Sequence, residues 1–238
     1  MSNNSFSTEQ LNLIVRMALH DLDVPFAVSS RVFGRMVEGK FDYKNASHVR
    51  LVRSSLISLE RARRMINDLN AVLSGGRLTA SLKLCELREI VDDIVREFSV
   101  IADSENQEFK WTCINAGKVL TDVDFVHRIV VNFLLNALYH GNTGKPIFLE
   151  VYGDKLKNSK TQGFILKITN SGKLIPIEYL ETIFDPGVQL DMHANRKWKG
   201  QGLGLAFCKM AADAIGGIVK AENLADGSGV VFTLEVKS

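Results

Sequence analysis

The chain has 238 residues, of which 46% are hydrophobic, and this is enough apolar material for one large domain or two modest ones. Its formal net charge of +2 predicts no strong attraction to nucleic acid or to anionic lipid. No apolar run reaches the roughly 18 residues that a membrane span needs. Because the first residues also lack the basic start and apolar core of a signal peptide, we expect a cytoplasmic protein with no nucleic-acid partner and no membrane insertion.

Two long amphipathic helices are expected at the start of the chain. Apolar residues recur at three- and four-residue steps from about Ser7 to Val37, and again from Val49 to Leu73. Gly39 lies in the break between them, and Ser74-Gly75-Gly76 ends the second pattern. Two such helices joined by a short link form an antiparallel hairpin. Because two helices alone cannot bury both apolar faces, we expect a homodimer in which two hairpins make a four-helix bundle.

After Gly76 the pattern changes to mixed helices and strands. Helices are predicted over roughly Glu86 to Ile101, around Asn132 and after Gly204. Strands are predicted at 108–114, 147–153, 163–169, 218–223 and 229–236, where apolar and polar residues alternate. The fold class is therefore α+β. We expect one domain over residues 1–76, the helical hairpin, and a second over residues 77–238, an α/β sandwich.

His20 is a candidate phosphate carrier on the first helix. The apolar stripe centres near Leu22 and Val15, and at about 100° per residue His20 lies roughly 160° away from it. Asp21 supplies a carboxylate that can hold one imidazole proton, which leaves the other ring nitrogen as a nucleophile toward phosphorus. Pro25 removes a backbone hydrogen bond one turn later and favours a kink. Taken alone, His20 is also compatible with an ordinary surface histidine.

Two pairs of residues are candidates for holding a nucleotide. Asn132 and Asn136 are four apart on a helix, so their side chains share one face, and amide oxygens suit Mg²⁺ and the anchoring of phosphates. A pair of buried, hydrogen-bonded amides is the alternative. Asn170 and Gly172 follow a predicted strand, where a polar side chain beside a glycine can receive an adenine ring. The alternative there is a simple turn.

A glycine-rich stretch, Gly200-Gln201-Gly202-Leu203-Gly204, leads directly into a predicted helix. Glycines let the backbone approach phosphates closely, and the start of a helix supplies amide donors and a favourable dipole. The polar segment at 185–199 ends in Lys199 and has the composition of a lid whose cations neutralise a γ-phosphate. A bare loop is the alternative for the glycines alone.

Five motifs occur in a characteristic order: HDLDVPF from His20, NFLLNALYHG from Asn132, NSGKLIP from Asn170, IFDPG from Ile183 and GQGLGL from Gly200. Together they resemble the cytoplasmic catalytic core of sensor histidine kinases of two-component systems, over almost the whole chain. The resemblance implies an ATP-binding domain of the histidine kinase, Hsp90 and gyrase type, with helices on a mixed sheet, that uses ATP and Mg²⁺. It also implies three partners: a second copy, the receiver domain of a response regulator, and a separate sensor protein.

The resemblance assigns roles to residues. His20 is implied as the phosphoryl acceptor and Asp21 as its acid/base partner, while Asn136 is implied as the Mg²⁺ ligand. The implied nucleotide-binding residues are Asn132, Asn136, His140, Asn170, Gly172, Phe184, Lys199, Gly200, Gly202, Leu203 and Gly204. Three departures from the family pattern stand out: Asn170 stands where aspartate is usual, Leu174 replaces a glycine, and Val24 stands where threonine or asparagine is common, with Asp23 before it in place of a basic residue. The third departure predicts weak or absent phosphatase activity toward the partner.

The predicted function is therefore a kinase that phosphorylates His20 from ATP and passes the phosphoryl group to an aspartate of a response regulator. One alternative is a phosphotransfer adaptor on the same scaffold that takes phosphate from another protein and does not use ATP. A second alternative is a binding module or another member of the wider ATPase group, which leaves the exposed His-Asp pair without a role.

Overall fold

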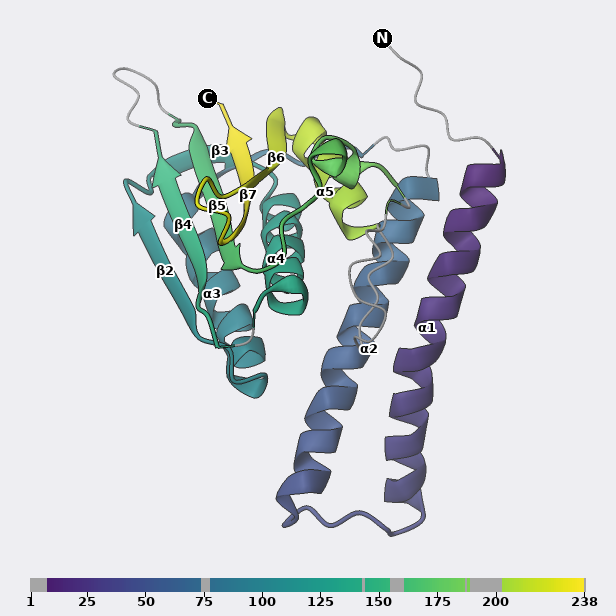
Figure 1. Ribbon diagram of the computed structural model, residues 1–238. Helices are drawn as coiled ribbons and strands as arrows, with labels where there is room; N and C mark the ends of the chain where they lie inside the picture. Colours follow the sequence, from purple (N-terminus) through teal and green to yellow (C-terminus); the bar gives the residue numbers. More distant parts are fainter. Residues whose placement is uncertain are drawn as a thin grey trace.

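The computed structural model describes residues 8–73, 78–142, 144–154, 161–186, 188 and 203–237. A long helical hairpin stands beside a five-stranded sheet that is covered on one face by helices (Figure 1). The α+β class expected from the sequence is confirmed, as is the order of a hairpin followed by a sandwich.

The hairpin consists of α1 (Thr8–Val37) and α2 (Ala46–Leu73), which agree closely with the expected helices. The link between them is held by local hydrogen bonds. The Asn45 side chain accepts from the Ser47 amide at 2.9 Å at the start of α2. The His48 ring accepts from the Asp42 amide at 3.0 Å and lies against Phe41. His48 therefore has a structural position in the turn.

Some of the apolar residues of α1 pack against α2, whereas others face outward. The line of α1 residues buried in the hairpin comprises Leu22, Pro25, Ser29 and Val32. Three other apolar residues that the sequence placed in the same stripe are about half exposed: Leu19 (57%), Phe26 (48%) and Phe33 (49%). The single stripe expected for α1 is therefore wrong in detail, because α2 covers only one edge of it.

The large sheet has the strand order β2-β4-β5-β7-β6. Its strands are β2 (Phe109–Ile114), β4 (Ile147–Gly153), β5 (Phe164–Ser171), β6 (Gly217–Asn223) and β7 (Gly229–Val236). Strand β2 pairs in parallel with β4, whereas the other neighbours are antiparallel. The predicted pairing of the strands at 147–153 and 163–169 is confirmed, and the sheet is mixed as the resemblance implied.

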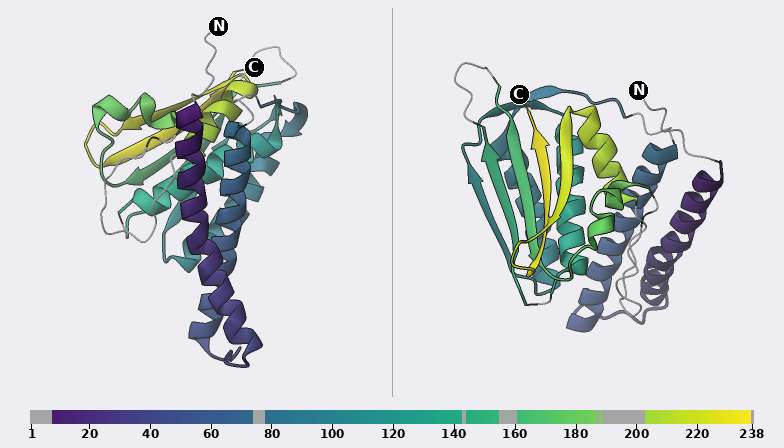
Figure 2. Two further views of the ribbon diagram at one scale, coloured as in Figure 1. Left: turned by 90° about the vertical axis from the view of Figure 1, so that its right-hand side faces the viewer. Right: turned by 45° about the horizontal axis from the view of Figure 1, so that its top comes forward.

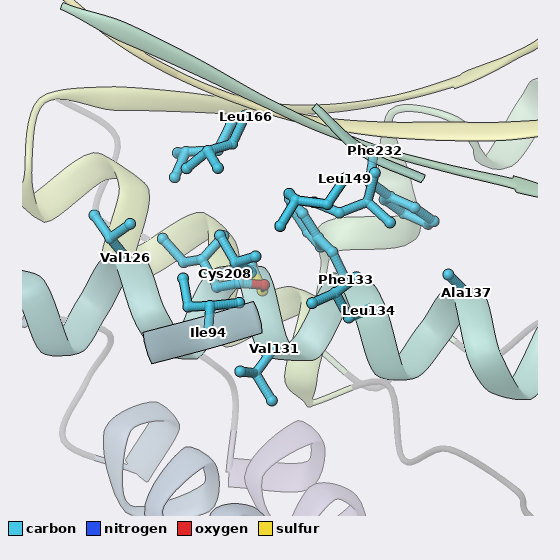
Figure 3. Close-up of a cluster of buried hydrophobic side chains, with 14 of the residues drawn as sticks. Ile94, Val126, Val131, Phe133, Leu134, Ala137, Leu149, Leu166, Cys208 and Phe232 are labelled. Atoms are coloured by element: carbon cyan, nitrogen blue, oxygen red, sulfur yellow. The ribbon is translucent and has the colours of Figure 1, made fainter. Parts of the chain in front are cut away.

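The core lies between this sheet and the helices α3 (Leu87–Ser104), α4 (Val123–His140) and α5 (Gly204–Ala214). Helices α3 and α4 pack side by side on one face of the sheet, and α5 lies beside α4 and against β6 (Figure 2). Figure 3 shows Phe133 and Leu134 of α4 within the cluster formed with Leu149 and Phe232 of the sheet. The packing of this layer fixes α4 against the sheet, and it therefore also fixes where the polar residues of α4 lie.

Two short strands were not expected from the sequence. Strands β1 (Lys83–Glu86) and β3 (Lys118–Thr121) form a separate two-stranded antiparallel sheet. Glu86 belongs to β1, so α3 begins one residue later than predicted and extends to Ser104. Four-residue strands carry too little periodicity to be recognised from sequence alone.

The hairpin contacts the rest of the chain through α2, which lies against α5 (Figure 1). Cys85, Cys113 and Cys208 are all free thiols. Across the residues that the structure describes, none of the helices is both long and apolar enough to cross a bilayer.

Candidate functional site

Helix α4 carries the two candidate asparagines. Asp122 caps its start, since one carboxylate oxygen accepts from the Phe125 amide at 3.1 Å and the other accepts from the Ser81 amide at 2.7 Å. Asn132 and Asn136 lie about three and four turns further on and are half-buried, whereas most of the residues around them are buried in the core. The helix therefore presents two amides in an otherwise apolar environment.

Asn132 contacts the start of α5. Its Nδ2 donates to the Gly204 carbonyl oxygen at 3.3 Å, across 72 residues of sequence. A Cβ on Gly204 would lie 3.3 Å from Asn132 Oδ1 and 3.4 Å from its Cγ, so a glycine at this position lets the two segments approach. Leu203 precedes the helix, is buried and makes no side-chain capping hydrogen bond. The first turn of α5 thus offers backbone donors beside an amide of α4.

Asn170 lies where β5 meets the end of α4. It is 5% exposed, and its Nδ2 donates to the Ser171 carbonyl oxygen at 3.3 Å. Gly141, which follows α4, and Gly172 form an isolated antiparallel bridge beside it. A Cβ on either glycine would lie within 3.3 Å of Asn170 Nδ2. Both glycines are therefore needed for the end of α4 to close over Asn170.

Phe184 joins the site to the core. It lies in η2 (Thr182–Phe184), a short 3-10 turn, and is 4% exposed. Its ring packs edge-on against Phe133, the neighbour of Asn132, and against Phe232 of β7, at 6.4 Å between centroids in each case. The segment that enters the predicted lid is thus anchored on the helix that carries the asparagines.

One site residue was missed by the sequence analysis. Asn223, at the end of β6, donates from Nδ2 to the Ile175 carbonyl oxygen at 2.7 Å and accepts from the Ile175 amide at 2.9 Å. The Asn223 amide holds the irregular segment that follows Gly172, where Leu174 replaces the family glycine and is 38% exposed. A lone asparagine at a strand end carries no sequence signal for such a contact.

Several predicted residues cannot be placed in this geometry. Lys199, Gly200 and Gly202, with most of the predicted lid, lie outside the described residues. His20 and Asp21 lie within α1, but their side chains are outside what the structure describes. His140 is an exposed residue in the last turn of α4, and its carbonyl oxygen lies beside Gly172, 2.9 Å from where a Cβ would be.

The polar groups suit a nucleotide with a hard cation. The amides of Asn132 and Asn136 offer neutral oxygens, and the described residues contain no group of three or more His, Cys, Asp or Glu side chains that could hold a metal. Mg²⁺ takes few protein ligands and completes its shell with water and phosphate oxygens. The donor set therefore fits Mg²⁺ that arrives with a phosphorylated ligand, and it does not form a closed protein cage.

Residues 121–238 match the sequence model of a family described as histidine kinase-, DNA gyrase B- and HSP90-like ATPase. The matched segment is therefore similar to an ATPase domain of this family. The domain begins at the end of β3 and includes α4, α5 and the four strands from β4 to β7. All the described site residues, from Asn132 to Gly204, lie inside it.

Relatives extend the similarity beyond the ATPase domain. The sensor protein VanSB of Enterococcus faecalis is 27% identical over 222 residues, which cover 92% of this chain and 47% of VanSB. The histidine kinase AdeS of Acinetobacter baumannii has the same fold, with a TM-score of 0.59 and 20% identity over 92% of this chain and 97% of AdeS. The histidine kinase ThkA, crystallised with the response regulator TrrA, has a TM-score of 0.57 and 19% identity, over 92% of this chain and 59% of that one. The chain is thus related to the catalytic cores of two-component histidine kinases, and it spans about half the length of VanSB.

Proposed function

We propose that this chain is an ATP-dependent histidine kinase that phosphorylates His20 and then passes the phosphoryl group to an aspartate on a response regulator. One observation carries the proposal. Three segments distant in sequence, at Gly172, Phe184 and Gly204, meet on α4 within a domain of an ATPase family. The same chain carries a His-Asp pair on the hairpin in front of that domain.

We place the adenine beside Asn170 and Gly172. The Oδ1 atom of the buried Asn170 amide can accept from the adenine amine, and the bridge between Gly141 and Gly172 holds the backbone close around that amide. The phosphates then extend toward the start of α5, where Gly204 and Asn132 lie together. Asn136 would hold Mg²⁺, which supplies positive charge against the phosphates. His140, Lys199, Gly200, Gly202 and Leu203 complete the proposed site.

His20 is proposed as the acceptor. Arg16, Asp23, Ala27 and Arg31 lie on the same side of α1 and are exposed, so this part of the helix is open to an approaching domain. In the transfer, an imidazole nitrogen forms a bond to the γ-phosphorus, the bond from that phosphorus to the β–γ bridging oxygen breaks, and ADP leaves. Asp21 holds the proton on the other ring nitrogen.

A homodimer is proposed because the single hairpin leaves apolar surface exposed. Phe26 and Phe33 on α1, one heptad apart, and Leu56 on α2 are each about half exposed.

The hairpin is proposed as residues 1–76 and the catalytic domain as residues 77–238. The receiver domain of a response regulator is the proposed phosphoryl acceptor after His20, in line with the ThkA complex. A separate sensor protein is a further proposed partner. Because ATP is the donor, the cytoplasm is the proposed compartment.

The kinase is favoured over a phosphotransfer adaptor. An adaptor that does not use ATP has no need for the Asn132–Gly204 contact or for the closed glycine bridge at Asn170. The match to an ATPase family over residues 121–238 supports the same choice.

Incubation with Mg²⁺ and ATP labelled in the γ-phosphate tests the proposal. The full chain should acquire an acid-labile label, and His20→Gln should reduce it to background, while His127→Gln should keep it because His127 pairs with Glu97 away from the site. EDTA should abolish labelling. An adaptor would take no label from ATP but would take it from a phosphorylated protein donor. Label that persists in His20→Gln would refute His20 as the acceptor.

A further inference from the structure

A chain of buried hydroxyl groups links the two helices of the hairpin. Ser29 Oγ, on α1, donates to the Pro25 carbonyl oxygen at 2.8 Å. Ser55 Oγ, on α2, donates to Ser29 Oγ at 2.9 Å. The two serines are 3% and 2% exposed. Buried polar groups in a two-helix contact are costly unless they are paired, and here each hydroxyl donates to an oxygen within the chain of contacts.

The linkage acts at a weak point of α1. Pro25 has no amide hydrogen, so the carbonyl of residue 21 lacks its normal donor one turn later. A serine hydroxyl that bonds back to the carbonyl four residues earlier also favours a bend. Residues 20 and 21, the proposed acceptor and its acid/base partner, lie directly before this point. The direction of the helix segment that carries them therefore depends on the geometry at Pro25 and Ser29.

Small residues on the face of α2 that packs against α1 allow the two helices to approach closely near Ser29. In the antiparallel register set by the Ser29–Ser55 bond, Leu22, seven residues earlier on α1, lies level with Ala62, seven residues later on α2. Ser55, Ser58 and Ala62 are all buried and all small. Small side chains bring the two backbones near each other, so a short hydroxyl bridge can span them. The bridge then sets how α1 sits against α2.

We infer that Ser29 and Ser55 are positioning residues for phosphoryl transfer, because they hold α1 against α2 at the level of Pro25 and so orient the turn that carries His20. The inference rests on the proposed kinase function. Phosphoryl transfer needs the nucleophile in line with the breaking bond, and small displacements of an attacking group cost large factors in rate. A displacement of α1 changes this alignment without touching the nucleotide site on α4 and α5.

Two substitutions at position 55 isolate the hydroxyl group. Ser55→Thr and Ser55→Val have nearly equal volume, but only threonine retains the donor to Ser29. Autophosphorylation of the full chain should show kcat about tenfold lower in Ser55→Val than in Ser55→Thr, with the same KM for ATP and the same ATP Kd in both. Ser29→Ala should lower kcat similarly. Combining it with Ser55→Val should add little, because both changes break one linkage.

Ser30→Ala and Ser54→Ala serve as matched controls, since both serines are exposed neighbours on the same helices. They should leave kcat unchanged. All variants are assayed below the lowest Tm of the set, so that a loss of folding does not enter the rates. Equal kcat in Ser55→Thr and Ser55→Val, or an equal loss in the controls, would overturn the inference while leaving the proposed function intact. Absence of His20 labelling in the unmodified chain would overturn both.

Discussion

Asn170 is a polar side chain that is almost wholly buried at the junction of β5 and α4. One of the two polar atoms of its side-chain amide already has a partner, because Nδ2 donates to the Ser171 carbonyl oxygen. That carbonyl oxygen has a second donor, the Asn142 amide at 2.7 Å. The Ser171 carbonyl would therefore keep a hydrogen bond without the Asn170 side chain, so the role of Asn170 in binding can be separated from its role in folding.

Asn170→Ala should weaken ATP binding about tenfold while the domain stays folded, because the variant loses the acceptor for the adenine amine but leaves Ser171 paired. The measurement is the ATP Kd by calorimetry, with GTP as a second ligand, since discrimination between the two bases should also fall. Thr169→Ala is the control, because residue 169 points to the opposite face of β5. An unchanged ATP Kd in Asn170→Ala would remove Asn170 from the proposed adenine site.

At the scale of elements, the contact between α4 and α5 depends on one glycine. Gly204 is the first residue of α5, and its carbonyl oxygen accepts from Asn132. Cys208 Sγ, one turn later on α5, lies 3.8 Å from the Ile129 carbonyl oxygen of α4, so the two helices stay close over this whole stretch. A side chain on Gly204 would be tighter against Asn132 than ordinary packing allows, and the Asn132 amide is the group that must move.

Gly204→Ala should therefore reduce ATP affinity several-fold with little change in Tm. Little change in Tm is expected because the three atoms nearest to such a Cβ all belong to the Asn132 side chain, which can shift. Gly34→Ala on α1 is the control, since a Cβ there meets nothing within 4 Å. It should stabilise the hairpin and leave the ATP Kd unchanged. A Gly204→Ala variant with normal affinity would show that the spacing at this contact does not matter for the nucleotide.

At the scale of the whole molecule, the hairpin leaves a line of apolar side chains exposed. Leu19, Phe26 and Phe33 follow one another at heptad spacing along α1, and each is about half exposed. On α2, Leu56, Ile66 and Leu73 are exposed to 57%, 39% and 43%. An apolar surface of this length on paired helices is the usual sign of a further helical partner. A second hairpin of the same kind would cover it.

Phe26→Ser combined with Phe33→Ser should convert the protein from a dimer to a monomer. Light scattering after gel filtration should give twice the 26.5 kDa mass of one chain for the unmodified protein and the single mass for the variant. Ile218→Ser removes an exposed apolar residue from β6 and should leave the dimer intact. A mass of 26.5 kDa for the unmodified protein at micromolar concentration would refute the dimer.

Much of the fold follows from local patterns along the chain. The helical period placed α1 and α2 within a few residues of their observed ends, and alternation identified every strand of the large sheet. Of the motif residues singled out in the sequence, Gly172, Phe184 and Gly204 are found at contacts with α4 or the residue that follows it. These features are legible because helix period, strand alternation and turn residues act over only a few neighbouring residues.

Contacts between distant segments were decided by the tertiary structure alone. The clamp of Asn223 on Ile175, the pairing of β1 with β3 and the Ser29–Ser55 bridge join residues that carry no signal of one another in sequence. The division of the α1 stripe into a buried edge and an exposed one also depended on where α2 lies. Such contacts arise only when packed layers bring the segments together, because their hydrogen bonds and buried surfaces depend on geometry and not on local propensity.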